Sequence, residues 1–311
     1  MNSIVDKKIY TKEELLNLYN LPLAELLEKS AKYMSNNVEF CSLVNARNGK
    51  CSQDCKYCAQ SSHYRTDIES YPLIDINVVK KAAKEAKANM VSRFAIVTSG
   101  KTPDEGRDFQ IERDMIKEIN KIDGLTSCAS IGILNEEQAK LLSEAGLNRF
   151  HHNINTCRSY YPQICTTHSW EERFNTCKLV KKYGMGLCCG VILGMGESVE
   201  HRVEMAMELA QIEPDSIPIN ILMPIPQTPF ENYHDKIDEE HILRTMAVFK
   251  IANPHSVVRF CGGRMKLSQE NQELALKTCV EGILVGNYLT TVGRQPSDDI
   301  KTVEKLGKTL G

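Results

Sequence analysis

Residues 51–58 read Cys-Ser-Gln-Asp-Cys-Lys-Tyr-Cys, so three thiols stand in a CxxxCxxC array directly after an apolar run. An iron–sulfur cube normally takes four cysteine thiolates, one for each iron. A local set of Cys51, Cys55 and Cys58 would therefore hold three irons and leave the fourth open. An open metal position is typical of reactive rather than structural sites. The loop is thus predicted to be a redox or Lewis-acid site built on a cluster, with a zinc knuckle completed by His63 as the alternative.

The spacing of this loop resembles the radical S-adenosylmethionine (SAM) superfamily. In that superfamily SAM chelates the open iron of a 4Fe–4S cluster, and electron transfer then yields a 5′-deoxyadenosyl radical. The resemblance places Tyr57 beside the adenine of SAM. The longer string from Asn48 to Ser62 is similar to that of the biotin synthase family, and this likeness extends over residues 38–291.

The bulk properties of the chain describe a protein with an ample core and balanced charge. It has 311 residues, of which 42% are hydrophobic, and a formal net charge of −2. That balance gives no indication of a nucleic-acid or anionic-membrane partner, and no apolar run reaches the roughly 18 residues of a membrane span. The 12 cysteines follow a polar start without a signal-peptide pattern, so we expect free or metal-bound thiols in a reducing cytoplasm.

Short apolar runs alternate with longer amphipathic segments along most of the chain. Leucines at helical spacing in residues 11–35 predict an N-terminal helical cap. Helix start signals follow, among them Asp75, Asn135 and a capping box of Ser169 with Glu172. The expected strands are residues 38–45, 93–100, 125–134, 149–155, 186–194, 216–222, 256–263 and 283–290.

Eight such alternations without a break in composition favour an α/β protein with a (β/α)8 TIM-type barrel. An open doubly wound sheet is the alternative. We expect a single domain over residues 1–311, with a helical cap at 1–36, the barrel at 37–292 and a helical tail at 293–311. Function in such barrels lies at the carboxyl ends of the strands, where the three-cysteine loop follows the first expected strand.

Two expected strands carry residues suited to binding a flat, hydroxylated ligand. The fifth contains a GxIxGxxE pattern that includes Gly190 and Ile192, and its glycines would let a ligand approach the backbone, although an ordinary turn is the alternative. On the fourth, alternation aims His151, Asn153 and Asn155 to one side. Buried amides need partners, and an amide suits a ribose hydroxyl or a ureido group.

The family resemblance gives these positions roles. It implies that the GxIxGxxE segment contacts adenine and that Asn153 contacts the bound ligands. His151 and Asn155 depart from the family, which has asparagine and aspartate there, so a ribose would be held without a charge. Arg173 resembles the arginine that pairs with the methionine carboxylate, a task that suits a bidentate guanidinium; a solvated helix arginine is the alternative.

The resemblance also implies a second, auxiliary iron–sulfur cluster inside the barrel, which supplies the sulfur atom. Cys128 and Cys188 align with its cysteine ligands, and Arg259 aligns with the arginine ligand of the usual two-iron form. Ala95 stands at the position of a third cysteine ligand, and alanine cannot bind iron. A two-iron cluster of the usual ligation therefore cannot form here unchanged.

Two other thiols are candidates to replace the missing ligand. We expect a relocated auxiliary cluster held by Cys128, Cys188 and one or both of Cys41 and Cys261. Four thiolates suit a four-iron cluster better than a two-iron one, and Arg259 would then be a hydrogen-bond donor beside the cluster rather than a ligand. The alternative is that Cys41 and Cys261 fill core space as small hydrophobic residues.

The remaining cysteines are expected to pack rather than to bind metal. Cys189 has the opposite parity to Cys188 and should face the helices. The others lie on predicted loops or helices and are Cys157, Cys165, Cys177 and Cys279.

The family's substrate is dethiobiotin, and the resemblance implies radical insertion of sulfur between two of its carbons. Asn220 matches a position that contacts the ureido ring, and Thr290 and Thr291 match hydroxyls near the carboxylate, although a strand exit is the alternative. The family also implies a flavodoxin or ferredoxin electron donor and a homodimer. Alternative functions are a relative without sulfur insertion, such as a methylornithine synthase or hydrogenase maturase, and a non-catalytic electron carrier or metal store.

Overall fold

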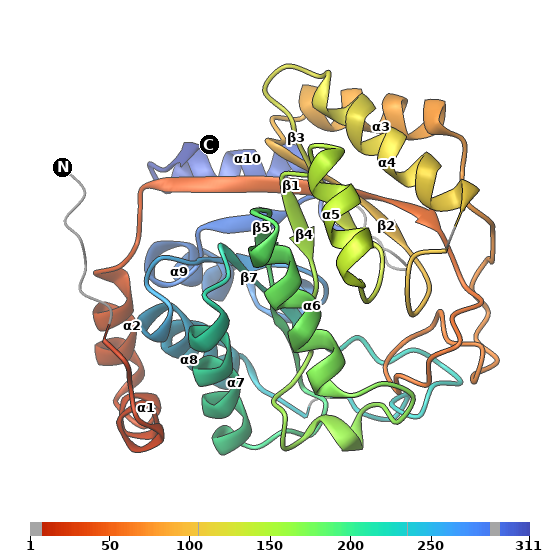
Figure 1. Ribbon diagram of the computed structural model, residues 1–311. Helices are drawn as coiled ribbons and strands as arrows, with labels where there is room; N and C mark the ends of the chain where they lie inside the picture. Colours follow the sequence, from red (N-terminus) through yellow and green to blue (C-terminus); the bar gives the residue numbers. More distant parts are fainter. Residues whose placement is uncertain (1–7, 105, 235, 287–292) are drawn as a thin grey trace.

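The computed structural model describes residues 8–104, 106–234, 236–286 and 293–311 (Figure 1). Its centre is a closed barrel of parallel strands, because the strand pairing that starts at β1 passes through β2 and onward to β9, which pairs again with β1. The barrel strands are β1 (Asn37–Arg47), β2 (Arg93–Thr98), β3 (Thr126–Ser130), β4 (Arg149–His151), β5 (Gly186–Cys188), β7 (Ser216–Ile221), β8 (Val257–Phe260) and β9 (Gly282–Leu284). The expected (β/α)8 barrel is thus confirmed, and the open sheet is excluded.

Helices cover the outside of the barrel, and the expected start signals operate as helix caps. The side chain of Asp75 accepts the N–H of Asn77, and Ser169 and Glu172 form a reciprocal capping box. The outer helices are α3 (Ile76–Ala88), α4 (Arg107–Asn120), α5 (Glu136–Glu144), α6 (Trp170–Lys182), α7 (Val199–Ile212), α8 (Glu239–Ala252), α9 (Gln269–Thr278) and α10 (Pro296–Lys305), with 3-10 turns η1 (Tyr161–Gln163) and η2 (Arg264–Lys266). Their apolar faces and the outer faces of the strands bury one continuous hydrophobic cluster, which stabilises the barrel.

The expected strand at residues 186–194 is divided into β5 and β6 (Val191–Leu193). The neighbouring strand β7 contains Pro218, which has no N–H to donate to the sheet at this level. At the same level Gly190 lies so close to β7 that a Cβ atom would come within 1.9 Å of the Pro218 carbonyl oxygen. Proline and glycine together therefore interrupt the ladder where the sequence pattern predicted one continuous strand.

The expected strand at residues 149–155 is also shorter in the structure, because β4 ends at His151. Asn155 has a φ of 66°, in the left-handed region that asparagine tolerates better than most residues. Simple alternation beyond His151 was therefore the wrong basis for orienting Asn153 and Asn155. The tail contains the expected helix α10, and then a short strand that the sequence analysis missed, β10 (Thr309–Leu310), which pairs with the start of β1.

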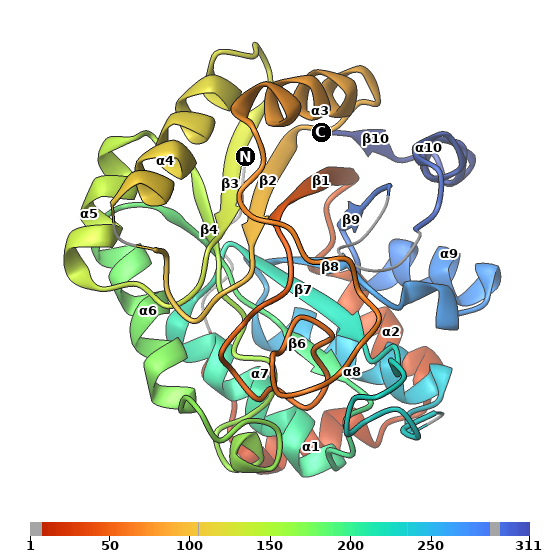
Figure 2. The ribbon, with the colours of Figure 1, turned by 90° about the vertical axis from the view of Figure 1, so that its right-hand side faces the viewer.

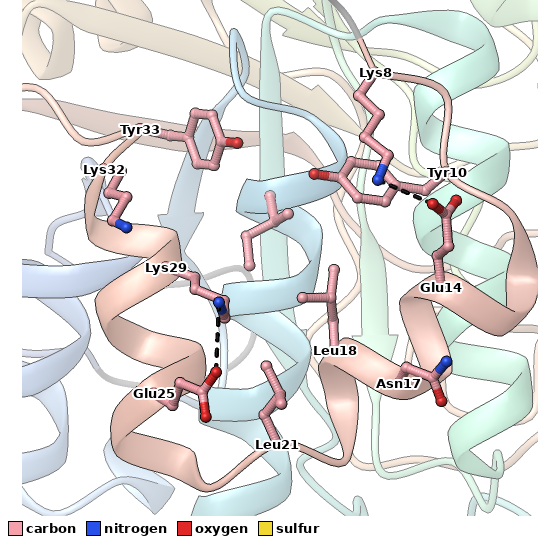
Figure 3. A pocket seen from close by; sticks show the side chains of 11 residues that line it. Lys8, Tyr10, Glu14, Asn17, Leu18, Leu21, Glu25, Lys29, Lys32 and Tyr33 are labelled. Carbon is pink, nitrogen blue, oxygen red and sulfur yellow. Dashed lines mark ion pairs between the residues drawn. The ribbon is translucent and has the colours of Figure 1, made fainter.

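The N-terminal helices α1 (Lys12–Tyr19) and α2 (Leu23–Ala31) pack against α7, α8 and α9. They border a surface cavity of about 540 Å³ that also touches Ile251 of α8 (Figure 3). Lysine–carboxylate pairs flank this cavity, with Nζ to oxygen distances of 2.9 Å for Lys8 with Glu14 and 3.4 Å for Lys29 with Glu25. Among the described residues, none of the helices is long and apolar enough to cross a membrane. The domain boundaries near residues 36 and 292 stay predictions.

Candidate active site

The three-cysteine loop connects β1 with α3 and lies across one end of the barrel (Figure 2). Its turn is held by backbone hydrogen bonds, with the N–H of Cys51 donating to the Gln60 carbonyl at 2.9 Å and that of Cys58 to the Cys55 carbonyl at 3.0 Å. Under the loop is a cavity of about 180 Å³ that Cys51, Cys55, Cys58 and Arg173 help to line. The array expected from the sequence thus faces a shared space at the carboxyl ends of the strands.

The three thiols of the array do not form a compact site for a single ion. Among the described residues, one group of three metal-binding side chains has all donor atoms within 4.8 Å of one another, and it does not contain Cys51 or Cys58. The thiols of the array are therefore too far apart to surround one ion together. The zinc alternative through His63 also lacks support, because its Nε2 lies 3.1 Å from the Ser52 carbonyl oxygen instead.

Burial raises the pKa of the Cys58 thiol to about 11, so at neutral pH it is a thiolate mainly when a metal replaces its proton.

The residues predicted to bind SAM form one connected network beside this loop. Asn155 donates from Nδ2 to the Tyr57 hydroxyl at 2.8 Å, and its carbonyl accepts the N–H of Ile192 at 2.8 Å. The Asn153 side chain accepts the N–H of Gly190 at 3.0 Å. The structure therefore brings three segments of the chain together, although it does so through loop hydrogen bonds rather than strand alternation.

Arg173 joins the same network from α6. Its Nε donates to the Asn153 carbonyl at 2.5 Å, and its Nη1 lies 3.3 Å from Nε2 of His168. The guanidinium also lines the cavity under the cysteine loop, so the alternative of a solvated helix arginine is wrong. A half-buried guanidinium that lines this cavity suits a carboxylate ligand.

Glu197 ends the GxIxGxxE segment and has a role that the sequence analysis did not assign. Its carboxylate accepts the N–H of Gly194 at 2.9 Å and the N–H of Met195 at 2.8 Å, and it pairs with Arg202 at 3.1 Å. These bonds hold the turn after β6 in place. The sequence signal for this role was the place of Glu197 three residues after Gly194, at the end of the GxIxGxxE pattern.

The predicted substrate residues are only partly described. Asn220 uses its amide within the barrel wall, donating to the Val191 carbonyl at 3.3 Å and accepting the N–H of Gly262 at 3.1 Å. Thr290 and Thr291 lie outside the described residues.

A second group of thiols lies inside the barrel. Cys41, Cys128, Cys188 and Cys261 are all buried, and none of them belongs to the outer hydrophobic cluster. They are near enough to interact electrostatically, since the charge on Cys41 would raise the pKa of Cys128, Cys188 and Cys261. The four predicted auxiliary ligands thus come from three strands, β1, β3 and β5, and from the position directly after β8. Ala95 packs beside Cys128, where it leaves no donor.

Beside these thiols is a layer of charge that the sequence analysis did not anticipate. The Glu39 carboxylate pairs with Arg93 and Arg259 and lies 3.2 Å from Nη1 of Arg149. Arg259 also donates from Nε to the Ser216 hydroxyl at 2.7 Å. Three guanidinium groups against one carboxylate leave an excess of positive charge in the barrel, which fits a bound anion such as a thiolate-ligated cluster.

Burial and the positive charge of the three guanidinium groups also shift the pKa values of neighbouring side chains. Burial raises the pKa of Cys128 to about 12, although Arg149 and Arg93 oppose this shift. For His151, burial and the nearby guanidinium groups lower the pKa to about 3, so the ring is neutral at physiological pH. A neutral imidazole can accept or donate one hydrogen bond to a ligand without adding charge.

A sequence signal for this charge layer existed. Glu39, Arg93, Arg149 and Arg259 each stand two residues before a position that the sequence analysis singled out: Cys41, Ala95, His151 and Cys261. In a strand this spacing places both members of each pair on one face. Charged residues on the inner face of apolar strands require partners, and here they supply one another.

We expect the Glu39 layer to make the stability of the protein sensitive to acid. Burial alone would raise the pKa of Glu39, but Arg259, Arg149 and Arg93 outweigh it and lower the pKa to about 2. Because the folded-state pKa lies below the unfolded value of about 4.3, the carboxylate stabilises the fold above that pH, by on the order of 3 kcal/mol, and this is lost as pH falls towards 2. Urea unfolding of the protein and of Glu39→Gln at several pH values measures the effect. The variant should be less stable at neutral pH and should lose less stability on acidification; parallel pH profiles would contradict the assignment.

Comparisons with known proteins agree with this geometry. The sequence model of the radical SAM superfamily matches residues 47–210, and that of the biotin and thiamin synthesis associated domain matches residues 218–309. A biotin synthase from Acetivibrio thermocellus is 46% identical over 89% of this chain and 85% of its own length. One from Clostridioides difficile is 40% identical over 99% of this chain and 97% of its own.

Solved structures of lower identity share the fold. A methylornithine synthase superposes with a TM-score of 0.81 at 18% identity, covering 97% of this chain and 94% of its own. A FeFe-hydrogenase maturase from Carboxydothermus hydrogenoformans has a TM-score of 0.83 at 12% identity, covering 98% of this chain and 76% of its own.

A closed barrel with a CxxxCxxC loop at its carboxyl end, matched by the superfamily model over more than half of the chain, defines a radical SAM enzyme. Enzymes of this class use SAM and a 4Fe–4S cluster. Within that class, the identity to curated relatives over nearly the full length shows that the chain belongs to the biotin synthase family.

Proposed function

We propose that this chain inserts sulfur into dethiobiotin to form biotin, with SAM as cosubstrate. The observation that carries the proposal is the second group of four thiols, which stands deeper in the same barrel as the predicted SAM site, beside three guanidinium groups. A radical enzyme without sulfur transfer has no need of such a group. The relatives named biotin synthase support the same substrate.

Cys51, Cys55 and Cys58 would hold the 4Fe–4S cluster, which when bound supplies the electron that cleaves SAM. Arg173 would then receive the methionine carboxylate, since its guanidinium lines the cavity under the loop. Tyr57 and Ile192 pack against the same small apolar cluster and would border the adenine. Backbone groups around Ile192 already have partners within the protein, since its N–H donates to the Asn155 carbonyl and the Val191 carbonyl accepts from Asn220. Apolar contact rather than hydrogen bonding would therefore dominate beside the adenine.

Asn153 and Asn155 would position the ribose and the substrate from the loop after β4. Both amides have one hydrogen bond within the protein, to Gly190 and to Tyr57 respectively, which fixes their orientation and leaves further donor and acceptor capacity. His151, Asn220, Thr290 and Thr291 remain candidates for the substrate. A neutral His151 is compatible with the uncharged ureido group.

Cys41, Cys128, Cys188 and Cys261 would hold the auxiliary cluster, of a four-iron type, which when bound supplies the sulfur atom. Arg259 would act beside the cluster rather than as a ligand, because its guanidinium already binds Ser216 and Glu39. The positive charge of the arginine layer would stabilise the anionic cluster. The alternative that Cys41 and Cys261 only fill space does not explain why they lie apart from the outer core.

We extend the proposal to the protein's surroundings. The described cysteines are all free thiols, which supports a reducing cytoplasm. A flavodoxin or ferredoxin would deliver the electrons, and the chain would work as a homodimer.

The test is anaerobic turnover of the reconstituted protein with SAM, a low-potential reductant and dethiobiotin. We expect 5′-deoxyadenosine and biotin to form together and both to depend on dethiobiotin. Formation of 5′-deoxyadenosine that does not respond to dethiobiotin would favour the methylornithine synthase or hydrogenase maturase alternative. Absence of 5′-deoxyadenosine under all conditions would favour an electron carrier or metal store.

A further inference from the structure

Cys165 and His168 lie directly against the three-cysteine loop, although the sequence predicted only a packing role for Cys165. The two residues follow η1 and precede α6. The Sγ atom of Cys165 lies 3.7 Å from Sγ of Cys55 and 3.2 Å from Nδ1 of His168. These three residues are the group, noted above, whose donor atoms all lie within 4.8 Å of one another. Both residues are buried, with 3% and 6% of their surfaces exposed.

Hydrogen bonds between the cysteine loop and the loop before α6 hold this arrangement in place. The Asp54 carboxylate accepts the N–H of Thr166 at 2.9 Å and that of Thr167 at 3.2 Å. In the other direction, the N–H of Lys56 donates to the Ile164 carbonyl at 3.0 Å. Because these bonds flank Cys55 on one segment and Cys165 on the other, the approach of the two thiols is set by the docking of two loops and not by a single side-chain rotamer.

The distances match one tetrahedral metal ion. Zinc binds thiolate sulfur at about 2.3 Å and imidazole nitrogen at about 2.0 Å, so two thiolates on one tetrahedral ion lie about 3.8 Å apart. The observed separation of Cys55 and Cys165 is 3.7 Å. Nδ1 of His168 lies 2.9 Å from Oε1 of Gln53, which can only accept, so Nδ1 carries the ring proton and Nε2, 3.9 Å from Sγ of Cys165, is the unprotonated nitrogen available to the metal. Metal-bound imidazoles usually have an outer hydrogen bond of this kind.

We propose that Cys55, Cys165 and His168 form a mononuclear site for a thiophilic divalent cation, with Zn²⁺ the expected ion and water in its fourth position. The site is available in the cluster-free protein. Cys55 belongs to both donor sets, so zinc at this site and a 4Fe–4S cluster at the three-cysteine array exclude each other. Zinc binding is therefore a competitor of cluster assembly. The zinc site stands on its own geometry, whereas the exclusion rests on the proposed cluster role of Cys55.

The first experiment titrates the full-length, cluster-free protein with Co²⁺ in the presence of a phosphine reductant, and then displaces Co²⁺ with Zn²⁺. We expect Cys165→Ala to lose one equivalent of bound Co²⁺, together with its sulfur-to-cobalt charge-transfer absorption and tetrahedral d–d bands. The matched variant Cys51→Ala should retain that equivalent. Loss in Cys51→Ala but not in Cys165→Ala would show that the ion binds the three-cysteine array, and would overturn the proposal. Equal retention in both variants would overturn it as well.

The second experiment tests the exclusion. One equivalent of Zn²⁺ is added before anaerobic reconstitution with iron and sulfide, and cluster formation is followed by absorbance and iron content. We expect zinc to slow reconstitution of the parent protein at least 10-fold and to have little effect on Cys165→Ala, whose zinc-free reconstitution also confirms that it folds. Equal inhibition of the two proteins would overturn the exclusion. Full cluster reconstitution in Cys55→Ala would instead show that Cys55 is not a cluster ligand. That result would contradict the proposed function and would leave the proposal of a zinc site intact.

Discussion

Replacement of Cys58 by alanine is expected to reduce 5′-deoxyadenosine formation by more than about 100-fold, since loss of an outer partner of a metal site already costs about 10–100-fold. Cys58 lies in the cavity that the loop shares with Arg173, and alanine at this position would leave one iron of the predicted cluster without a protein ligand. The measurement is single-turnover cleavage of SAM by the reduced, reconstituted protein, with iron and sulfide content determined on the same sample.

The matched control for this prediction is Cys279→Ala. Cys279 is fully buried at the end of α9 and belongs to the outer hydrophobic cluster, so its replacement removes a thiol of equal size without touching the loop. We expect this variant to lose some stability, on the order of 1 kcal/mol, and to keep its SAM cleavage. Comparable cleavage by Cys58→Ala and the control would mean that the three-cysteine array does not hold the reactive cluster.

The double variant Cys41→Ser and Cys261→Ser is expected to lose the auxiliary cluster and to form biotin at least 100-fold more slowly, while still cleaving SAM. A serine hydroxyl is a hard ligand with a high pKa and binds the irons of such a cluster far less well than a thiolate. Mössbauer spectroscopy on iron-57 protein should show the loss of one cluster component and retention of the other. Both residues lie near Arg259 and Cys188, so the loss should be confined to the barrel interior.

The chain offers a matched control for this double change as well. Cys177 on α6 and Cys189 beside the outer face of the barrel are both buried, and their sulfur atoms lie 3.8 Å apart. Cys189 was expected to pack in this place. Replacing both by serine changes the same number of thiols without touching the interior group. Full retention of the auxiliary cluster in the Cys41 and Cys261 double variant would end the hypothesis of relocated ligands, and the two residues would then be packing residues.

Local sequence determined those parts of the protein whose chemistry is contained within a few neighbouring residues. The CxxxCxxC loop places its thiols in one turn because only a few bonds separate them, and the backbone hydrogen bonds of the turn lie within the same segment. Helix starts such as Ser169 with Glu172 are local for the same reason. The alternation of strands and helices favoured a barrel, since parallel strands need crossover connections, but it left an open sheet as the alternative until the pairing of β9 with β1 showed closure.

Tertiary structure decided the features that depend on residues far apart in the chain. The interruption between β5 and β6 depends on Pro218 of another strand as well as on Gly190, and the pattern along residues 186–194 contains only the glycine. The pairing of Glu39 with Arg259 joins residues 220 positions apart and depends on barrel register. The contact of Cys165 with Cys55 spans 110 positions and depends on how the loop before α6 docks. Local sequence determines which side chains can donate or bind metal and which segments form strands or helices. Closure of the barrel determines which of these side chains meet, because burial favours only the register in which buried charges and thiols find partners.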